Sequence, residues 1–209
     1  MANKNHALDK QIITAALNEF LENGYEKASL RKIAAAADVT VGAIYTRYKT
    51  KDILFCSLVQ PLIMKIQQTF NVIRSEYAKG ADNYQLEDMA SNMQKESNAI
   101  LHLLFDDYDR AVLLFCQSAG SSLANFSDTI VQHKIDETLA FFKSAGIGNI
   151  SPDILRLLTT AQFHMYFQII NDGYELEEAR QMMNAAIIYH TGGWLAFLDS
   201  QDYKDKREG

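Results

Sequence analysis

Residues 29–51 read SLRKIAAAADVTVGAIYTRYKTK and constrain the fold more than any other stretch of the chain. Apolar and small residues recur at helical spacing on both sides of Asp38, which predicts two short helices joined by a tight turn. Ser29 and Thr40 each precede one of these helices and can cap it, because their hydroxyls accept hydrogen bonds from free backbone N–H groups. The run of alanines allows the two helices to cross closely. The stretch therefore predicts a helix-turn-helix unit.

The residues before and after this stretch extend the same pattern. Apolar side chains recur at helical spacing over residues 8–23, and Gly24 is suited to end that helix because it adopts positive φ without strain. Thr50 is placed to cap a further helix that begins at Lys51. Since the second helix of a helix-turn-helix enters the major groove of DNA, we expect a DNA-binding domain over residues 1–50.

The distribution of charge agrees with this expectation. Residues 1–52 contain eight Lys or Arg and six Asp or Glu, a net charge of +2, whereas the remaining 157 residues contain twelve and twenty, a net charge of −8. A local basic region on an acidic protein is typical of a DNA-binding surface, although a solvated charged face is the better explanation of the charges taken alone.

The rest of the chain predicts further helices and a second helical domain. Prolines and glycines are few, two and ten in 209 residues, which favours long helices. The fold class expected is all-α with about nine helices, comprising the helix-turn-helix domain and a helical effector-binding and dimerisation domain over residues 51–209. The helices expected in this second domain span residues 51–77, 85–104, 107–117, 127–145, 152–171 and 175–198.

Several classes of function are not expected. The chain has no apolar run of about 18 residues and no signal peptide, which favours a cytoplasmic protein without a membrane span. Cys56 and Cys116 lie in apolar runs without metal-ligand spacing, so we expect two reduced thiols, a disulfide being the alternative. No catalytic or metal-binding motif is present, so we expect neither enzyme activity nor a cofactor.

The helix-turn-helix region resembles the DNA-binding domain of the TetR (AcrR) family. The positions that agree with that family's pattern are Gly24, Tyr25, Ile33, Ala34, Ala37, Val39, Gly42, Tyr45, Tyr48, Lys51 and Leu54. Two positions depart from it. Asp38 stands where the family often has Gly, and Val41 stands where many relatives have a polar residue, which leaves apolar contact, for example with a thymine methyl group.

The resemblance also implies which residues contact DNA. Ser29 and Lys51 are expected to bind phosphates, and Tyr45 to bind phosphate through its hydroxyl. Arg31 and Arg47 are expected to reach a base or a phosphate. The remaining contacts expected along the groove are made by Thr40, Val41, Gly42, Ala43 and Thr46.

Helices 152–171 and 175–198 are apolar on more than one face, which predicts homodimerisation, as in the resembling family; an enclosed hairpin in a monomer is the alternative. The dimer-interface candidates are Phe163, Met183, Ile187, His190, Trp194 and Phe197. The effector-pocket candidates, each of which is also compatible with an ordinary core position, are Phe70, Met89, Met93, Phe115, Cys116, His133, Phe163, Tyr166 and Phe167.

The function expected is that of a homodimeric DNA-binding transcriptional regulator, most often a repressor in the resembling family. A small, largely apolar effector would release it from a palindromic double-stranded DNA operator. The alternative is a helical ligand-binding or adaptor protein without operator-specific regulation.

Overall fold

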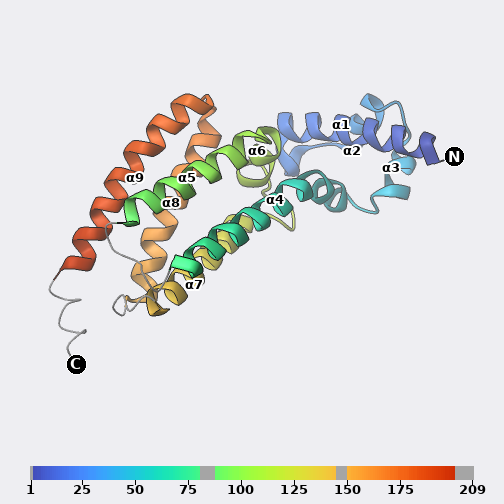
Figure 1. The fold of residues 1–209 in the computed structure, drawn as a ribbon. Coiled ribbons are helices and arrows are strands. Elements are labelled where there is room, and N and C mark those ends of the chain that lie inside the picture. Colours follow the sequence, from blue (N-terminus) through green and yellow to red (C-terminus); the bar gives the residue numbers. More distant parts are fainter. Residues whose placement is uncertain (1, 81–87, 145–149, 201–209) are drawn as a thin grey trace. The chain divides into compact units, whose positions relative to one another are not determined.

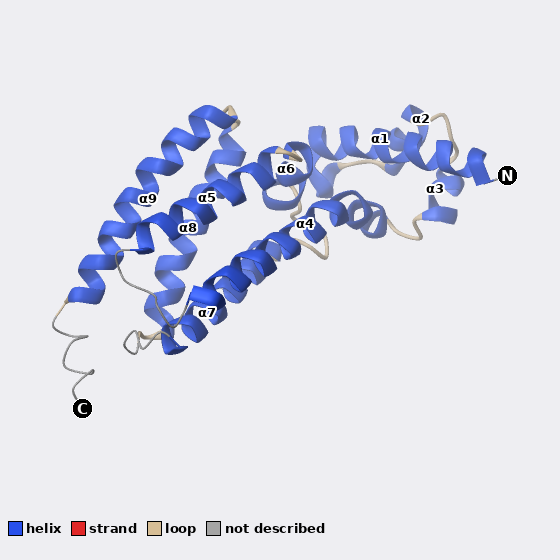
Figure 2. Cartoon of the chain, in the orientation of Figure 1, coloured by secondary structure: helices blue, strands red, loops and turns tan. Residues whose placement is uncertain are grey.

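The computed structural model describes residues 2–80, 88–144 and 150–200. These residues form helices and loops without a strand (Figures 1 and 2). The helices are α1 (Ala2–Lys27), α2 (Leu30–Ala36), α3 (Val41–Arg47), α4 (Lys51–Gly80), α5 (Met89–Phe105), α6 (Tyr108–Cys116), α7 (Phe126–Ser144), α8 (Pro152–Asp172) and α9 (Leu176–Asp199). The all-α fold class with about nine helices is confirmed for the described residues.

Contacts divide the chain into two compact units. The first unit comprises Met1–Lys65 and Asp107–Ser127, and the second comprises Ile66–Asp106 and Asp128–Gly209. The first unit therefore includes α6 and the beginning of α4 in addition to α1–α3. The boundary at residue 50 was predicted between a DNA-binding domain and an effector-binding domain, which are defined by function, and it stays a prediction.

The core of the first unit is formed where α1, α2, α3, α6 and the beginning of α4 pack together. Phe20 of α1 and Phe55 of α4 are 0% exposed, and their rings meet edge to face with centroids 5.1 Å apart. Tyr25 stacks on Phe20 and meets Phe55 edge to face, so three rings join α1 to α4. Ile33 and Ile44 bury the inner faces of α2 and α3.

Two of the residues with positive φ in this unit shape its first three helices. Gly24 has φ 67° and interrupts α1, which continues for one turn to Lys27 instead of ending at residue 23 as predicted. Asp38 has φ 52°, in the left-handed region that Asp tolerates better than most residues. The turn predicted between α2 and α3 is therefore confirmed.

The N-terminus of α2 is held differently from the prediction. Ser29 is the N-cap residue, but its hydroxyl makes no capping hydrogen bond among the described residues. Its backbone N–H instead donates to Oε1 of Glu19, a side chain on α1 that is 8% exposed. A buried carboxylate of α1 thus fixes the position at which α2 begins.

The segment after α6 is attached to the ends of α1 and α4. Gln117 accepts a hydrogen bond from the backbone N–H of Tyr25 and donates through Nε2 to the carbonyl of Leu21. Asp52, in the first turn of α4, accepts from the backbone N–H and the hydroxyl of Ser122, both at 2.8 Å. The two bonds between Asp52 and Ser122 connect residues 70 positions apart in the sequence.

The thiols of Cys56 and Cys116 are free, in agreement with the prediction, and both residues are half-buried rather than fully within the core. Burial raises the pKa of each thiol, which keeps both protonated at neutral pH.

In the second unit α9 packs against α5 and α8. The ends of α8 and α9 follow the sequence signals. Ser151 accepts from the N–H of Asp153 ahead of Pro152, Gly173 ends α8 with φ 74°, and Glu175 with Glu178 forms a capping box at the start of α9. The predicted beginning of the helix at residue 85 lies outside the described residues.

By length and apolar composition alone, the stretch Lys51–Tyr77 of α4 is able to span a membrane. Core helices meet the same criteria, and Leu54, Leu58 and Leu62 in this stretch are 0% exposed. Burial within the protein accounts for part of the apolar character of α4, and the absence of a membrane span stays a prediction.

Candidate DNA-binding surface and effector pocket

The beginning of α3 presents small and polar groups at the surface. Thr40 caps the helix by accepting the N–H of Ala43 at 3.1 Å, as predicted. Gly42 and Thr46 are exposed, and the Thr46 hydroxyl donates to the Gly42 carbonyl at 2.9 Å. Val41 and Ala43 are half-buried, so this end of α3 offers a shallow surface with few bulky side chains.

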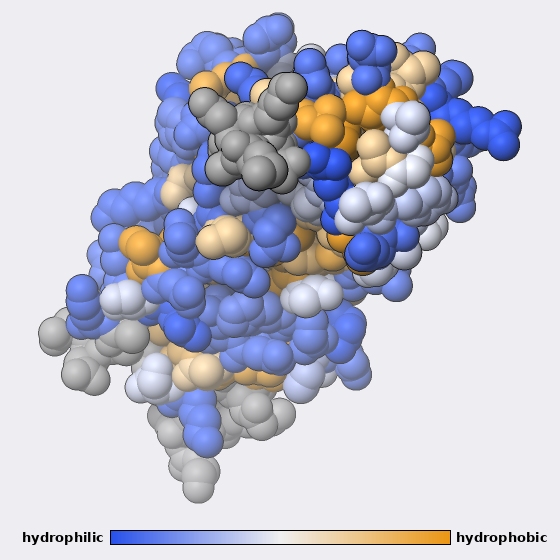
Figure 3. All heavy atoms as spheres, turned by 90° about the vertical axis from the view of Figure 1, so that its right-hand side faces the viewer, coloured by the Kyte–Doolittle hydropathy of each residue, from blue (hydrophilic) through white to orange (hydrophobic). Residues whose placement is uncertain are grey.

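Tyr45 lies on the outer side of α3, with 48% of its surface exposed. Arg31 on α2 is also exposed. Both side chains are available for contact with a partner, in agreement with the roles that the resemblance implies. Figure 3 views the protein from the side on which α1–α3 lie in Figure 1, and it shows hydrophilic and hydrophobic residues mixed on this face.

Arg47 is held against α1. Its Nε donates to Oδ1 of Asp9 at 2.6 Å, and 21% of its side chain is exposed. The sequence pattern singled out Arg47 but not Asp9, because an ion pair 38 residues apart leaves no local signal. The pair fixes the end of α3 to α1 and draws the guanidinium toward a carboxylate of the same chain.

Lys51 also contacts its own unit. Its Nζ donates to the carbonyl of Glu26 at 3.1 Å and lies 4.8 Å from the centroid of the Tyr25 ring. Burial lowers the pKa of Lys51, while the nearby Glu19 and Glu26 act in the opposite direction. These contacts position the ammonium group at the start of α4, which explains a lysine at a helix end where the dipole disfavours one.

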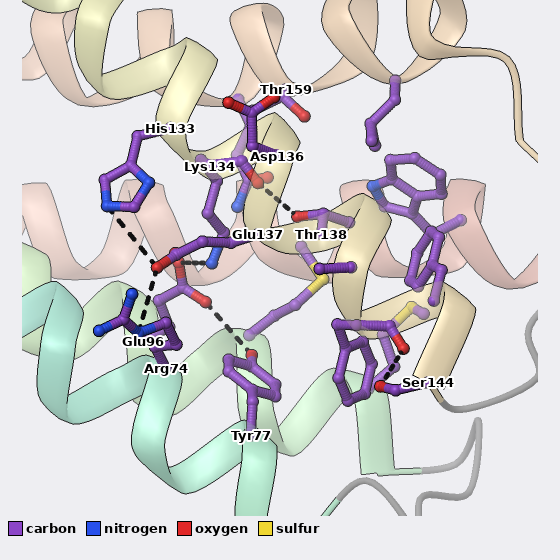
Figure 4. A pocket seen from close by; sticks show the side chains of 18 residues that line it. Arg74, Tyr77, Glu96, His133, Lys134, Asp136, Glu137, Thr138, Ser144 and Thr159 are labelled. Atoms are coloured by element: carbon purple, nitrogen blue, oxygen red, sulfur yellow. Dashed lines mark hydrogen bonds and ion pairs between the residues drawn. The ribbon is translucent and has the colours of Figure 1, made fainter.

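The second unit contains a pocket with a volume of about 480 Å³, within the range of small-molecule sites (Figure 4). It is formed by residues of α4, α5, α7, α8 and α9. The lining consists of Arg74, Tyr77, Met89, Met93, Glu96, His133, Lys134, Asp136, Glu137, Thr138, Ala140, Phe141, Phe142, Ser144, Leu155, Thr159, Gln162 and Trp194.

Of the predicted pocket residues, Met89, Met93 and His133 line this pocket. Phe163 and Tyr166 are 4% and 1% exposed and belong to the core of the second unit, where Phe70 and Phe167 each pack against the ring of Phe163. Phe115 and Cys116 belong to the first unit. Aromatic character in the sequence did not distinguish core positions from lining positions.

A charged lining of this kind was not predicted. Glu96 is 7% exposed, and its carboxylate accepts hydrogen bonds from the Tyr77 hydroxyl and from Lys134. Glu137 lies between Arg74 and His133, with ion-pair distances of 3.9 and 3.7 Å (Figure 4). The helical spacing of His133, Lys134 and Glu137 on α7 was the available signal, but Glu96 and Arg74, which pair with Lys134 and Glu137, lie on other helices.

Burial within the subunit accounts for most of the predicted dimer-interface residues. Phe163, Met183 and Ile187 are at most 4% exposed, and Trp194, at 8%, lines the pocket. His190 and Phe197 are half-buried. The exposed apolar residues of α8 and α9 are instead Ile154, Leu157, Met182, Ile188 and Tyr189.

Comparison with known proteins agrees with the geometry. Residues 12–58 match the model of the bacterial regulatory proteins of the tetR family. A TetR-like transcriptional regulator from Rhodococcus sp. RHA1 is 16% identical and superposes with a TM-score of 0.61, the match covering 90% of this chain and 96% of that one.

Two further solved structures share the fold. NalD of Pseudomonas aeruginosa, the secondary repressor of the MexAB-OprM multidrug efflux pump, is 20% identical with a TM-score of 0.58, covering 88% of this chain and 96% of its own. The transcriptional regulator FadR of Bacillus subtilis, solved with stearoyl-CoA, is 18% identical with a TM-score of 0.53, covering 85% and 96%.

The resemblance inferred from residues 24–54 is therefore confirmed. Residues 12–58, which include the helix-turn-helix region, are similar to the tetR family of bacterial regulatory proteins, and over nearly its whole length the chain has the fold of TetR-like transcriptional regulators.

Proposed function

We propose that the chain is a ligand-responsive transcriptional regulator of the cytoplasm that binds a palindromic DNA operator through α3. The observation that carries this proposal is the exposed, small-residue beginning of α3, positioned by the Asp38 turn and the Thr40 cap. A helix that enters the major groove needs such an end, because bulky side chains would hold its backbone away from the base edges.

Positioning contacts to the DNA backbone carry much of the proposed recognition. Tyr45 and Lys51 lie on either side of the loop after α3 and present a hydroxyl and an ammonium group, both suited to phosphate. Arg47 would read a base or a phosphate after giving up its bond to Asp9.

Repression with release by a small effector is the proposed mode of regulation. The pocket of the second unit has the volume for such a molecule. NalD, which has a similar fold, is named as a repressor, and FadR was solved with a fatty acyl thioester. An effector that binds one conformation of the dimer better than another shifts operator affinity by its coupling free energy, about 1–3 kcal/mol.

We propose that the regulator is a homodimer formed by the outer faces of α8 and α9. Leu157, Ile188 and Tyr189 are 70, 74 and 81% exposed, an unusual exposure for apolar side chains on neighbouring helices. Gly192 and Gly193 lie on α9 with no described atom within 4 Å of an added Cβ, which leaves room for close approach by a partner helix.

Sedimentation velocity tests the dimer. The wild-type chain is expected to sediment as a dimer at micromolar concentration and Ile188→Glu as a monomer, because the new carboxylate would be buried without a partner. Lys95→Glu, an exposed position on α5, serves as the control and is expected to leave the dimer intact. A wild-type monomer would contradict the proposal.

Selection of bound fragments from genomic DNA tests the proposed function. Enrichment of one palindromic site is the expected result. Tyr45→Phe, which removes a hydroxyl alone, is expected to weaken binding to that site about fivefold, the value of one hydrogen bond. Tyr174→Phe makes the same change between α8 and α9, outside the proposed dimer interface, and is expected to leave DNA binding unchanged. No enrichment would instead favour a helical ligand-binding or adaptor protein.

A further inference from the structure

Four aromatic residues form a continuous row in the pocket of the second unit. The ring of Tyr77 lies 5.4 Å from that of Phe141, Phe141 lies 6.1 Å from Phe142, and Phe142 lies 6.2 Å from Trp194. All four residues line the pocket. This aromatic row offers ring faces and edges to an apolar ligand, and ring faces also attract cations.

One carboxylate at the pocket is satisfied within the protein. Glu96 accepts the Tyr77 hydroxyl at 3.2 Å through Oε2 and Lys134 Nζ through Oε1. The Lys134 ammonium is thereby neutralised, and it also lies 5.5 Å from the Tyr77 ring centroid. The pair is buried and carries no net charge, so it neither attracts nor repels a charged ligand strongly.

A second carboxylate is left unsatisfied. Oε1 of Glu137 is buried and has no hydrogen-bond partner among the described residues. The nearest nitrogen atoms of other side chains, Nε of Arg74 and Nε2 of His133, are 3.9 and 3.7 Å away, too far for a hydrogen bond. Buried acceptors in proteins are nearly always paired, so this oxygen is suited to accept a donor from outside the chain.

Exposure distinguishes Glu137 from its neighbours. The Glu137 side chain is 17% exposed, whereas those of Arg74 and His133 are 58 and 52% exposed. The side chains of Arg74 and His133 can therefore turn toward solvent when a ligand enters, whereas the carboxylate is largely enclosed at the pocket.

The charges of the lining favour a cationic ligand. Glu96, Asp136 and Glu137 are negative and Arg74 and Lys134 positive, which gives a net charge of −1 with His133 neutral. A carboxylate ligand would meet this negative charge, whereas an ammonium ligand would compensate it.

We infer that the pocket binds an amphipathic organic amine in its protonated form. The ammonium donates to Oε1 of Glu137, and the apolar body lies along the aromatic row. Glu137 and Phe141 are four residues apart on α7, which places them on one face about 5–6 Å apart at Cβ, a separation that a short alkyl linker spans. The inference rests on the proposed function in taking this pocket as the effector site.

Calorimetric titration of the full chain without DNA tests the inference with three molecules that share one body. The probes are 3,3-diphenylpropylamine, 3,3-diphenylpropan-1-ol and 3,3-diphenylpropanoic acid. The amine is expected to bind at least about tenfold more tightly than the alcohol, since a charge-assisted hydrogen bond replaces a neutral one, and the acid is expected to bind most weakly.

Glu137→Gln provides the specific test. This change keeps the shape of the side chain and removes its charge, so it is expected to weaken the amine about tenfold and to change the alcohol less than about twofold. Glu76→Gln removes the same charge from an exposed position of α4 outside the lining and is expected to leave both affinities unchanged. Far-ultraviolet circular dichroism checks that the variants are folded.

Each outcome decides the inference. Tighter binding of the acid than of the amine, equal effects of Glu137→Gln and Glu76→Gln, or no binding of the three probes at about 1 mM would overturn it. Addition of the amine to the complex with the DNA fragment enriched in the selection experiment separates the two proposals. An amine that binds at Glu137 without releasing DNA supports the inference and contradicts effector control.

Discussion

Replacing Asp52 by alanine removes the acceptor of two hydrogen bonds that attach the segment after α6 to the beginning of α4. Both bonds, from the N–H and the hydroxyl of Ser122, measure 2.8 Å. The hydrogen bond from the backbone N–H of Ser122, and to a smaller extent that from its hydroxyl, hold the pKa of Asp52 below its usual value. The ionised carboxylate is therefore the form that accepts these bonds.

The magnitude follows from these contacts. A hydrogen bond to a charged acceptor contributes about 1.5–3 kcal/mol, but Ser122 is exposed, so we take about 1 kcal/mol for each bond. The charge of Asp52 in the first turn of α4 adds about 0.5 kcal/mol. Asp52→Ala is therefore expected to lower the free energy of unfolding by about 2–3 kcal/mol.

Urea denaturation followed by circular dichroism measures this value, and a double-mutant cycle with Ser122→Ala tests its origin. Ser122→Ala removes the hydroxyl, which bonds Asp52 and lies 3.4 Å from Sγ of Cys56, and keeps the backbone N–H bond. It is expected to cost about 1 kcal/mol in the wild-type chain and clearly less beside Asp52→Ala. Equal costs in both backgrounds would refute the reasoning, because they would mean that the two side chains do not interact.

Three further predictions concern DNA binding, pH and backbone strain. Lys51→Gln is expected to flatten the log–log dependence of DNA affinity on salt concentration by about 0.9, as for one lost phosphate contact, and an unchanged slope would exclude that role. Burial lowers the pKa of His190, against a smaller opposing effect of the Leu158 carbonyl, so the unfolded chain binds more protons than the folded chain at mildly acidic pH. The thermal midpoint of the wild-type chain should therefore fall as the pH drops below 6.5, the ordinary pKa of histidine, and that of His190→Gln should fall less. Gly120→Ala is expected to lower the free energy of unfolding by more than about 1 kcal/mol, because φ is +81° and the new Cβ would lie 2.7 Å from Cγ of Glu26; an unchanged denaturation midpoint would contradict this.

The parts of the fold that depend on a residue and its immediate neighbours were predictable from the sequence. Gly24 and Asp38 adopt the positive φ values expected of them, and Thr40 and Ser151 cap the helices that follow them. In each case the side chain, or for Gly24 the lack of one, affects only the backbone of the same residue or of a residue at most three positions away. Helix periodicity likewise predicted the described helices, apart from their terminal turns.

The contacts that position the candidate sites were not predictable in the same way. Glu19 holds Ser29, and Asp9 holds Arg47, across 10 and 38 residues of sequence. Such pairs depend on how helices pack, and a single sequence carries no signal for them. At Ser29 the start of the helix was predicted correctly, but the capping hydrogen bond of its hydroxyl was not, because its backbone N–H bonds Glu19 instead.

The assignment of faces on α8 and α9 was limited for the same reason. Both helices are apolar on more than one side, so the sequence predicted a second packing surface without indicating which side faces the core. The structure buries Met183 and Ile187 and leaves Leu157 and Ile188 exposed. The pocket residues were missed in part because Glu96 on α5 and Glu137 on α7 contact residues of a distant helix, Tyr77 and Arg74 of α4.

Site-specific photocrosslinking tests the central claim, that α3 binds the operator, most directly. A photoreactive phenylalanine analogue is placed at position 45, where the native side chain is 48% exposed, or at position 72 on α4, where it is 58% exposed. With the palindromic fragment obtained by selection, we predict crosslinks to DNA from position 45 that unlabelled fragment suppresses, and none from position 72. Crosslinks from position 72 without crosslinks from position 45 would contradict the account.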